Sequence, residues 1–493
     1  MPRLSRRNSA WIPNYPGHHG REGEALPRPY GRNSAWIPNY PGHHGREGEA
    51  PPRPYGRNSA WIPNYPGHHG REGEAPPRPY HCSARCNSAA RKCINLRGVL
   101  VMTPSTEPVR LRGMTWNHSR GYTPMVATAQ RYCELHLTAD ITWEKRSLQA
   151  FADQPLEQLA ERYDLLVIDH PWVGFAARTG WLLPLDEHLP APFLDELTAQ
   201  SVGPSARSYR FEGHQWALAI DTATPVASWR PDLIALGDLP RSWAGLLKLA
   251  RAGRVLMPGI PVDTLMNFFM VCSTLGEDVA QSAERVVSAQ VGAQALSMLR
   301  ELAQALDPLF FDLNPIRVYE AMTATDRFAY CPFAYGYNNY SRDGYARRPL
   351  EFGDLVEIDG RPCRTTLGGA GLAISSRCAG VEAALDYAAF VADPVCQRTL
   401  YFENGGQPGH RSSWTDARVN AACRNFFINT LPALDRAFLR PRYPGYLRFQ
   451  DCAGAPIRDY LRQGGDERTL LERLDSLYRE SRKEGQPCGR SMA

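Results

Sequence analysis

The sequence predicts an α/β protein of two lobes, preceded by a long segment that belongs to neither lobe. From about residue 109 onward, apolar runs typical of strands alternate with amphipathic stretches typical of helices. The roughly 390 residues of this body are enough to form two cores. The first 95 residues, by contrast, consist largely of a proline-rich repeat.

The amino-terminal segment repeats one 25-residue unit almost unchanged. The unit NSAWIPNYPGHHGREGEAPPRPYGR begins at Asn8, Asn33 and Asn58. Each copy offers one Trp, one Ile and two Tyr, which is too little apolar surface to offset the entropy lost on ordering the chain. We therefore expect residues 1–95 to be disordered. The near-identity of the copies also favours a recent duplication, or an upstream sequence translated from a misplaced start codon, with Met102 or Met114 as the true start.

Charge is distributed unevenly along the chain. Residues 1–95 carry a net charge of +8 and the remaining residues a net charge of −3, within a total of +5. Nucleic-acid-binding proteins concentrate Lys and Arg on the folded domain, so this distribution argues against a nucleic-acid partner. No run approaches the ~20 apolar residues that span a bilayer, which argues against an integral membrane protein.

The first half of the body alternates strand and helix patterns. RLRGMTW (110–116) alternates as a half-buried strand does, and TPMVATAQRYCELH (123–136) has the apolar spacing of a helix. ADITWEKR (139–146) repeats the strand pattern and PLEQLAERY (155–163) the helix pattern. DLLVID (164–169) is the continuous apolar run of a buried parallel strand. This order predicts βαβ units and a parallel sheet.

The second half of the body is richer in helices. A hairpin-like pair (208–220) leads into it, and helical periodicity is strong in 242–253 and 283–306. Strands are expected at 327–337 and, rich in glycine, at 365–375. The remaining predicted helices cover 381–393, 394–404 and 467–483.

Four phrases in this order carry a family resemblance. They are MTWNHSRGY (114–122), HQWALAIDTATPVASWRPDL (214–233), PRSWAGLLKLARAGRVLMPG (240–259) and GGAGLAISSRCAGVEAALDYAAFVADPVCQRTLYFENGGQPGHRSSW (368–414). Together the phrases resemble the extracellular solute-binding proteins of ABC importers, in the broad family 1 group that includes maltose- and other carbohydrate-binding proteins. The resemblance implies a periplasmic-binding-protein-like type II fold, with two α/β lobes around a ligand cleft. Lobe 1 would comprise 105–221 and 365–415, and lobe 2 would comprise 222–364 and 416–485.

The resemblance also implies a function. We expect a monomer that binds a small polar solute (a carbohydrate, a polyol or a small organic acid) for the membrane subunits of a bacterial ABC importer, without a cofactor. Export to the periplasm is implied as well. However, Met1 is not followed by the apolar run of a secretory signal, and nine scattered cysteines in the body suit a reducing cytosol. A cytosolic ligand-sensing module that uses the same cleft therefore stays open.

Candidate ligand-binding residues follow from a rule for open α/β sheets, in which ligands bind beyond the carboxyl ends of strands. The residues selected are Trp116, Asn117, His118, Arg120, Trp143, Glu144, Asp169, His170, Trp172, Asp221, Thr222, Tyr335, Asn338, Asn339, Tyr340, Gly369, Gly371 and Gln407. Aromatic faces stack on sugar-like rings, and polar side chains hydrogen-bond hydroxyls or carboxylates. Glycines permit close approach of the backbone.

Several of these residues have a second interpretation. Trp143 and Trp172 suit core packing equally well, and His118 and His170 suit structural hydrogen bonds. Asp221 suits a hinge as well as a ligand contact.

An enzyme is the main alternative from another class. The chain contains no GxSxG elbow, no HExxH motif and no GxxxxGK[ST] phosphate loop, so no catalytic residue is predicted. No metal site is predicted either. The cysteines at 82, 86 and 93 lack the paired spacing of zinc ligands, and the chain has no adjacent tyrosines of the kind used by iron carriers of the resembled fold.

Overall fold

The computed structural model describes residues 107–148 and 155–484. Contacts between residues divide the chain into two units, Met1–Gly98 and Val99–Ala493. All described residues belong to the second unit. The predictions for the repeat segment 1–95 therefore concern residues outside the described ranges.

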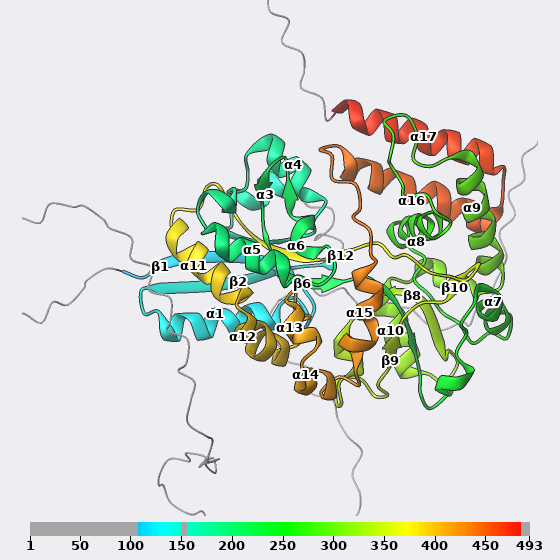
Figure 1. Cartoon of the computed structure of the whole chain (residues 1–493), viewed down its shortest axis with the longest axis horizontal. Helices are drawn as coiled ribbons and strands as arrows, with labels where there is room; N and C mark the ends of the chain where they lie inside the picture. Colours follow the sequence, from blue (N-terminus) through cyan, green and yellow to red (C-terminus); the bar gives the residue numbers. More distant parts are fainter. Residues whose placement is uncertain (1–106, 149–154, 485–493) are drawn as a thin grey trace, which may run out of the picture. The chain divides into compact units, whose positions relative to one another are not determined.

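A five-stranded sheet with the order β2-β1-β3-β12-β6 forms the first lobe (Figure 1). Its strands are β1 (Val109–Trp116), β2 (Ala139–Arg146), β3 (Leu165–Ile168), β6 (Leu218–Ala223) and β12 (Gly368–Ile374). β1 runs parallel to β2 and β3, whereas β12 runs antiparallel to β3 and to β6. The carboxyl ends of β1, β3 and β6 and the amino end of β12 therefore meet at one edge, which is where ligands of such sheets bind.

Each face of this sheet has its own core. Leu165 and Val167 of β3 face one core, whereas Leu166 and Ile168 face the other. A strand buried on both faces needs apolar residues at every position, which explains the run in DLLVID. The helices around this sheet are α1 (Thr123–Leu135), α3 (Leu156–Ala160), α4 (Trp172–Thr179), α5 (Ala191–Ala199), α6 (Ser205–Ser208), α11 (Val381–Ala392) and α12 (Pro394–Cys396).

The second lobe contains an antiparallel sheet with the order β8-β7-β9. Its strands are β7 (Pro225–Trp229), β8 (Tyr330–Tyr335) and β9 (Glu351–Gly353). The helices that contribute to its core are α7 (Trp243–Arg251), α8 (Pro261–Thr274), α9 (Ala289–Gln304), α10 (Pro315–Ala324), α13 (Arg411–Trp414), α14 (Ala417–Ala421), α15 (Phe426–Asp435), α16 (Tyr446–Gln463) and α17 (Glu467–Glu484). α16 packs against α8, α9 and α17, and these four helices lie together in Figure 1.

Two short hairpins complete the strands. β4 (Arg210–Phe211) pairs with β5 (His214–Gln215), and β10 (Glu357–Ile358) pairs with β11 (Arg361–Pro362). The β4–β5 pair lies within the hairpin-like stretch that the sequence predicts.

The segments that connect the two sheets are bonded to one another. The Thr224 hydroxyl, between β6 and β7, donates to the Thr366 carbonyl over 2.9 Å. The Leu367 amide, just before β12, donates to the Phe438 carbonyl over 2.9 Å. The lobe limits predicted from the sequence stay a prediction.

The α/β architecture predicted from the sequence is confirmed. Local differences include helices α5 and α10, which were not expected, and three more that have a clear position or cause. The helix expected from 283 begins at Ala289, because the Ser288 side chain caps it by accepting from the Val291 amide. α4 begins directly after β3, at Trp172, where no helix was expected. α8 was not expected because its residues from Asp263 to Thr274 are all buried, so it lacks an amphipathic stripe. No helix within the described ranges is long and apolar enough to cross a membrane.

Candidate ligand-binding site

A cavity of about 700 Å³ lies at the strand-end edge of the first sheet. This volume is within the range of about 300–1,000 Å³ typical of small-molecule sites. The first sheet and its loops contribute Trp116, Arg120, Leu148, Asp169, Asp221, Ala223, Gly368, Gly369 and Ala370. The elements of the second lobe and the segment before α16 contribute Ile260, Pro261, Val262, Asp263, Met266, Asn314, Pro315, Tyr335, Tyr337, Arg440, Gln450 and Asp451. Both lobes therefore line it.

Arg120, in the turn after β1, forms the first of two ion pairs beside the cavity. Its Nε donates to Asp221 Oδ2 over 2.8 Å and its Nη2 to Asp221 Oδ1 over 2.5 Å. Its Nη1 donates to the Gly336 carbonyl over 2.8 Å, and the guanidinium lies over the Tyr337 ring. Burial by itself would lower the pKa of Arg120, but the Asp221 carboxylate raises it above its usual value. The pair links the turn after β1 to β6, and the bond to Gly336 adds the segment that follows β8.

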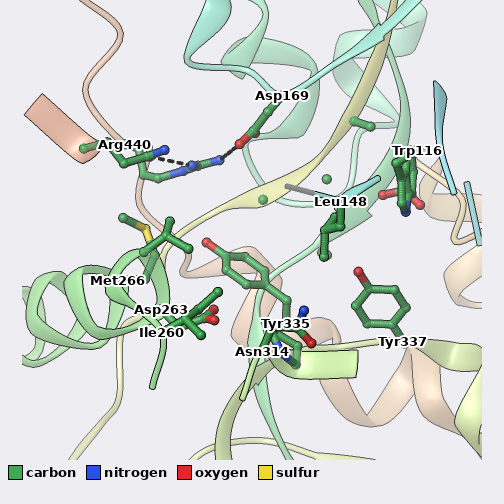
Figure 2. Close-up of a pocket in the computed structure, with 18 of the residues that line it drawn as sticks. Trp116, Leu148, Asp169, Ile260, Asp263, Met266, Asn314, Tyr335, Tyr337 and Arg440 are labelled. Carbon is green, nitrogen blue, oxygen red and sulfur yellow. Dashed lines mark hydrogen bonds and ion pairs between the residues drawn. The ribbon is translucent and has the colours of Figure 1, made fainter. Parts of the chain in front are cut away.

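Arg440, in the segment before α16, forms the second ion pair (Figure 2). Its Nη2 donates to both carboxylate oxygens of Asp169, over 2.5 and 2.6 Å. Its Nη1 donates to Gln450 Oε1 over 3.1 Å and its Nε to the Leu367 carbonyl over 3.2 Å. Burial opposes the ionised form of Asp169, but the Arg440 charge outweighs this effect and holds the Asp169 pKa below its usual value. Asp169, directly after β3, is thus an ionised carboxylate.

Asp263 lies in the first turn of α8 and, unlike Asp169 and Asp221, has no arginine paired with it among the described residues. Its side chain is largely buried, with 6% of the residue exposed. Among the described residues its Oδ2 has no hydrogen-bond partner. Burial raises the pKa of Asp263 to about 8, so the carboxyl is mostly protonated at neutral pH. Figure 2 shows Asp263 with Ile260 and Met266 on one side of the cavity and Trp116 on the other.

Aromatic side chains supply the remaining large surfaces. Trp116 ends β1, Tyr335 ends β8, and Tyr337 follows two residues later. The Tyr335 hydroxyl lies 3.0 Å from Thr366 Oγ1, which orients the ring. Gly368 must lack a side chain here, because a Cβ would lie 2.5 Å from the Tyr335 ring. Gly369 has a φ of 112°, and a Cβ there would lie 2.3 Å from the Asp221 carbonyl.

The structure brings six of the sequence-predicted residues to the cavity. They are Trp116, Arg120, Asp169, Asp221, Tyr335 and Gly369. The other twelve do not line it.

Several predicted residues around the first sheet have structural roles. Trp143 and Glu144 lie within β2 and not after it, because the strand continues to Arg146. Trp143 therefore packs in the core, with Nε1 donating to the Tyr387 hydroxyl. Glu144 points to the opposite face, where it pairs with Arg112.

The loops after β1 and β3 also turn some predicted residues away from the cavity. Trp172 is the first residue of α4 and packs in the core beside Phe175. His170 is fully buried beside Asp169, and burial together with the Arg440 charge lowers its pKa to about 4. Asn117 is exposed. His118, whose pKa burial lowers to about 4, packs edge-on against the Tyr337 ring.

The remaining predicted residues make structural contacts between chain segments. Gln407 joins two of them, because its Nε2 donates to the Thr222 carbonyl and its Oε1 accepts from the Asn338 amide. Asn339 Nδ2 donates to the Gly405 carbonyl. The Tyr340 hydroxyl donates to Glu320 Oε1. Gly371 faces the Tyr209 ring, where a Cβ would lie 2.6 Å from a ring carbon.

The sequence analysis missed six polar residues of the cavity, which are Asp263, Asn314, Tyr337, Arg440, Gln450 and Asp451. Tyr337 lies two residues after Tyr335, and residues two apart in a strand point to the same face. This spacing would have identified Tyr337 as a candidate. Asp263 follows Pro261 by two residues, and this pairing is typical of a helix start. Arg440 carries no local signal, because its segment has no regular secondary structure. Among the described residues, no group of three or more His, Cys, Asp or Glu is placed to hold a metal ion.

Comparison with solved structures identifies the class of fold. No protein-family model matches the sequence. The chain nevertheless has the fold of the solute-binding proteins of ABC transporters, the type II fold predicted above, and it spans nearly the whole length of the structures it matches. Sequence identity to them is low, so the likeness is one of fold.

Three of these structures illustrate the match. Maltose-bound MalE3 of T. maritima has a TM-score of 0.65 at 14% identity, covering 75% of this chain and 99% of its own. An ABC transporter solute-binding protein of Agrobacterium radiobacter in complex with ribitol has a TM-score of 0.65 at 17% identity, covering 76% and 99%. Another from Thermotoga lettingae, bound to α-D-tagatose, has a TM-score of 0.63 at 17% identity, covering 76% and 100%.

Proposed function

We propose that this chain binds a small polar solute in the cavity between its lobes and delivers it to the membrane subunits of an ABC-type importer. The observation that carries this proposal is the cavity itself. Aromatic faces of Trp116, Tyr335 and Tyr337 border it together with the paired charges around Asp169 and Asp221. Stacking surfaces combined with fixed hydrogen-bonding groups suit a polyhydroxylated ligand.

The fold supports the same proposal. The solved structures that it resembles hold maltose, ribitol and tagatose, which are all polyhydroxylated. A carbohydrate or a polyol is therefore the first class of ligand to test, and a small organic acid the second. The proposal assigns no catalytic step to the chain and treats it as a monomer.

Six residues found both by the strand-end rule and at the cavity are the proposed ligand contacts. Trp116 and Tyr335 would stack on or border the sugar ring, and Gly369 would allow the ligand to approach the backbone. The outer surfaces of the two ion pairs, formed by Arg120 with Asp221 and by Asp169 with Arg440, would hydrogen-bond its hydroxyl groups.

A thermal-shift screen of the full chain against sugars, polyols and organic acids tests this function. A ligand at 1,000 times its dissociation constant stabilises the folded state by about 4 kcal/mol, which is a shift of several degrees. We expect at least one sugar or polyol to raise the melting temperature. If no member of the three classes raises it, the solute-binding proposal is wrong.

A cytosolic ligand sensor is the second candidate, and the cysteines favour it. The eight cysteines in the described part of the chain form no disulfide, and six of them are buried. Free thiols in such number are typical of a reducing compartment. Osmotic shock of intact cells separates the candidates, because release of the protein supports import and retention with cytosolic markers supports the sensor.

A further inference from the structure

Two arginines and two aspartates of the cavity are paired with one another. Arg120 bonds to Asp221 and to the Gly336 carbonyl, and Arg440 bonds to Asp169, Gln450 and the Leu367 carbonyl. Each arginine therefore neutralises one carboxylate, of which Asp221 is buried and Asp169 partly buried. A ligand that enters the cavity meets no uncompensated positive charge from either of these arginines.

Asp263 is different, because the structure places it in the cavity with no charge of opposite sign beside it. Burial is the cause of its raised pKa, and its Oδ2 has no partner within the described ranges. The titratable groups whose pKa values respond to Asp263 are Cys331 and Tyr335 on β8 and Tyr337 just after it, and none of these carries a positive charge.

The surroundings of Asp263 favour a cation over other partners. Ile260, Val262 and Met266 line the cavity next to it, and apolar neighbours strengthen any charge pair formed there. Asp263 is also the third residue of α8, and the amino end of a 14-residue helix stabilises a carboxylate. A ligand carboxylate would bring a second negative charge to this position, which is unfavourable.

We propose that the natural ligand carries a basic amino group, as an amino sugar or an aminopolyol does, and that this group pairs with the Asp263 carboxylate. The inference rests on the proposed function, since it names the class of polar solute that the same cavity takes. The ammonium ion supplies the hydrogen-bond donors and the positive charge that the buried carboxyl lacks.

This pairing has a proton balance that can be measured. Near neutral pH the free protein holds a proton on Asp263, and the ligand arrives as an ammonium ion. Formation of the pair leaves the ammonium intact and releases the Asp263 proton to the buffer. Calorimetry in two buffers of different ionisation enthalpy reports the protons released on binding.

The experiment compares amines with their neutral counterparts on the full chain at pH 6.5. The probes are glucosamine against glucose, the β-1,4-linked glucosamine disaccharide against cellobiose, and glucamine against sorbitol. We expect the amine to bind at least about tenfold more tightly in one or more pairs, with proton release. Asp263→Asn should abolish both the preference for the amine and the proton release.

A matched control separates the Asp263 pairing from general charge. Asp459→Asn removes an exposed carboxylate from α16, outside the cavity, and should keep the preference for the amine. The Asp263→Asn variant itself needs a folding control. Asn has the shape of the protonated Asp263 carboxyl, so an unchanged melting temperature at pH 5 verifies that Asp263→Asn folds.

The outcomes distinguish the inference from the function on which it rests. If neutral members bind as tightly as amines in every pair, the amine inference is wrong and solute binding stands. The same holds if Asp263→Asn retains the preference. If neither series binds, nor any other sugar, polyol or organic acid of the thermal-shift screen, both proposals are overturned.

Discussion

The carboxyl groups on the two sides of the cavity differ in whether they have a charged partner. On the strand-end side, Asp169 and Asp221 are each paired with an arginine. The Arg440 charge lowers the pKa of Asp169, whereas burial raises the pKa of Asp221 in spite of its pair with Arg120. On the side formed by the start of α8, Asp263 is buried among apolar residues and mostly protonated. Aspartates of one cavity can therefore differ in protonation, because the neighbours of a carboxyl group determine its pKa.

The largest effect should come from breaking one pair on the strand-end side. Arg120→Met leaves Asp221 buried without its counter-charge, so we expect a loss of about 3–5 kcal/mol in unfolding free energy. Urea unfolding at pH 7 measures it. The double variant Arg120→Met/Asp221→Asn removes both charges and should recover part of the loss. A single variant that loses less than about 1 kcal/mol would show that the pair contributes little.

On the α8 side, the buried Asp263 should make the protein less stable as pH rises. The pKa of Asp263 is raised on folding, so the folded state keeps a proton that the unfolded state releases above pH ~4. Its contribution to stability is present below pH ~4 and is lost as pH rises to about 8, by up to about 1.4 kcal/mol per pH unit.

The matching measurement uses Asp263→Asn, which cannot ionise. The difference in unfolding free energy between this variant and the wild type should shift in favour of the variant from pH 4 to pH 8, and then level off. A difference that stays constant over this range would mean that Asp263 titrates normally in the folded protein.

Substitution of two tryptophans tests which of them lies in the ligand cavity and which in the core. Trp116→Phe reduces the stacking surface and should weaken binding of the solute found in the thermal-shift screen about five- to tenfold. Trp172→Phe removes a similar surface from the core behind β3 and should lower the melting temperature without changing affinity. Calorimetric titration of both variants checks this. Equal affinity losses would place Trp172 in the site.

The smallest effect concerns a single hydrogen bond at the end of β8. Tyr335→Phe removes the contact with Thr366 Oγ1 and should cost about 0.5–1.5 kcal/mol of stability. Tyr337→Phe is the control, because no described residue forms a hydrogen bond with the Tyr337 hydroxyl. Urea unfolding of the two variants compares them, and equal stabilities would indicate that the Tyr335 bond contributes nothing.

Local pattern was enough to predict part of the cavity. Trp116 ends an alternating strand, Asp169 follows an apolar one, and Asp221 and Gly369 lie on strands that meet at the same edge. The strand-end rule finds such residues because the direction of a strand determines where its last side chains lie. Trp143 misled the same rule, because β2 continues past it and period 2 turns its side chain into the core.

Taken by itself, the sequence determined the α/β class, the strands that end at the cavity and the family of folds. Only the tertiary structure decided which charges meet. Arg440 lies 271 residues from Asp169 along the chain, and the two are joined by the packing of an irregular segment against β12 and β3. The state of Asp263 likewise depends on what packs around it. Secondary structure is encoded in short-range patterns, whereas the ionisation of a buried group depends on neighbours that are distant in sequence.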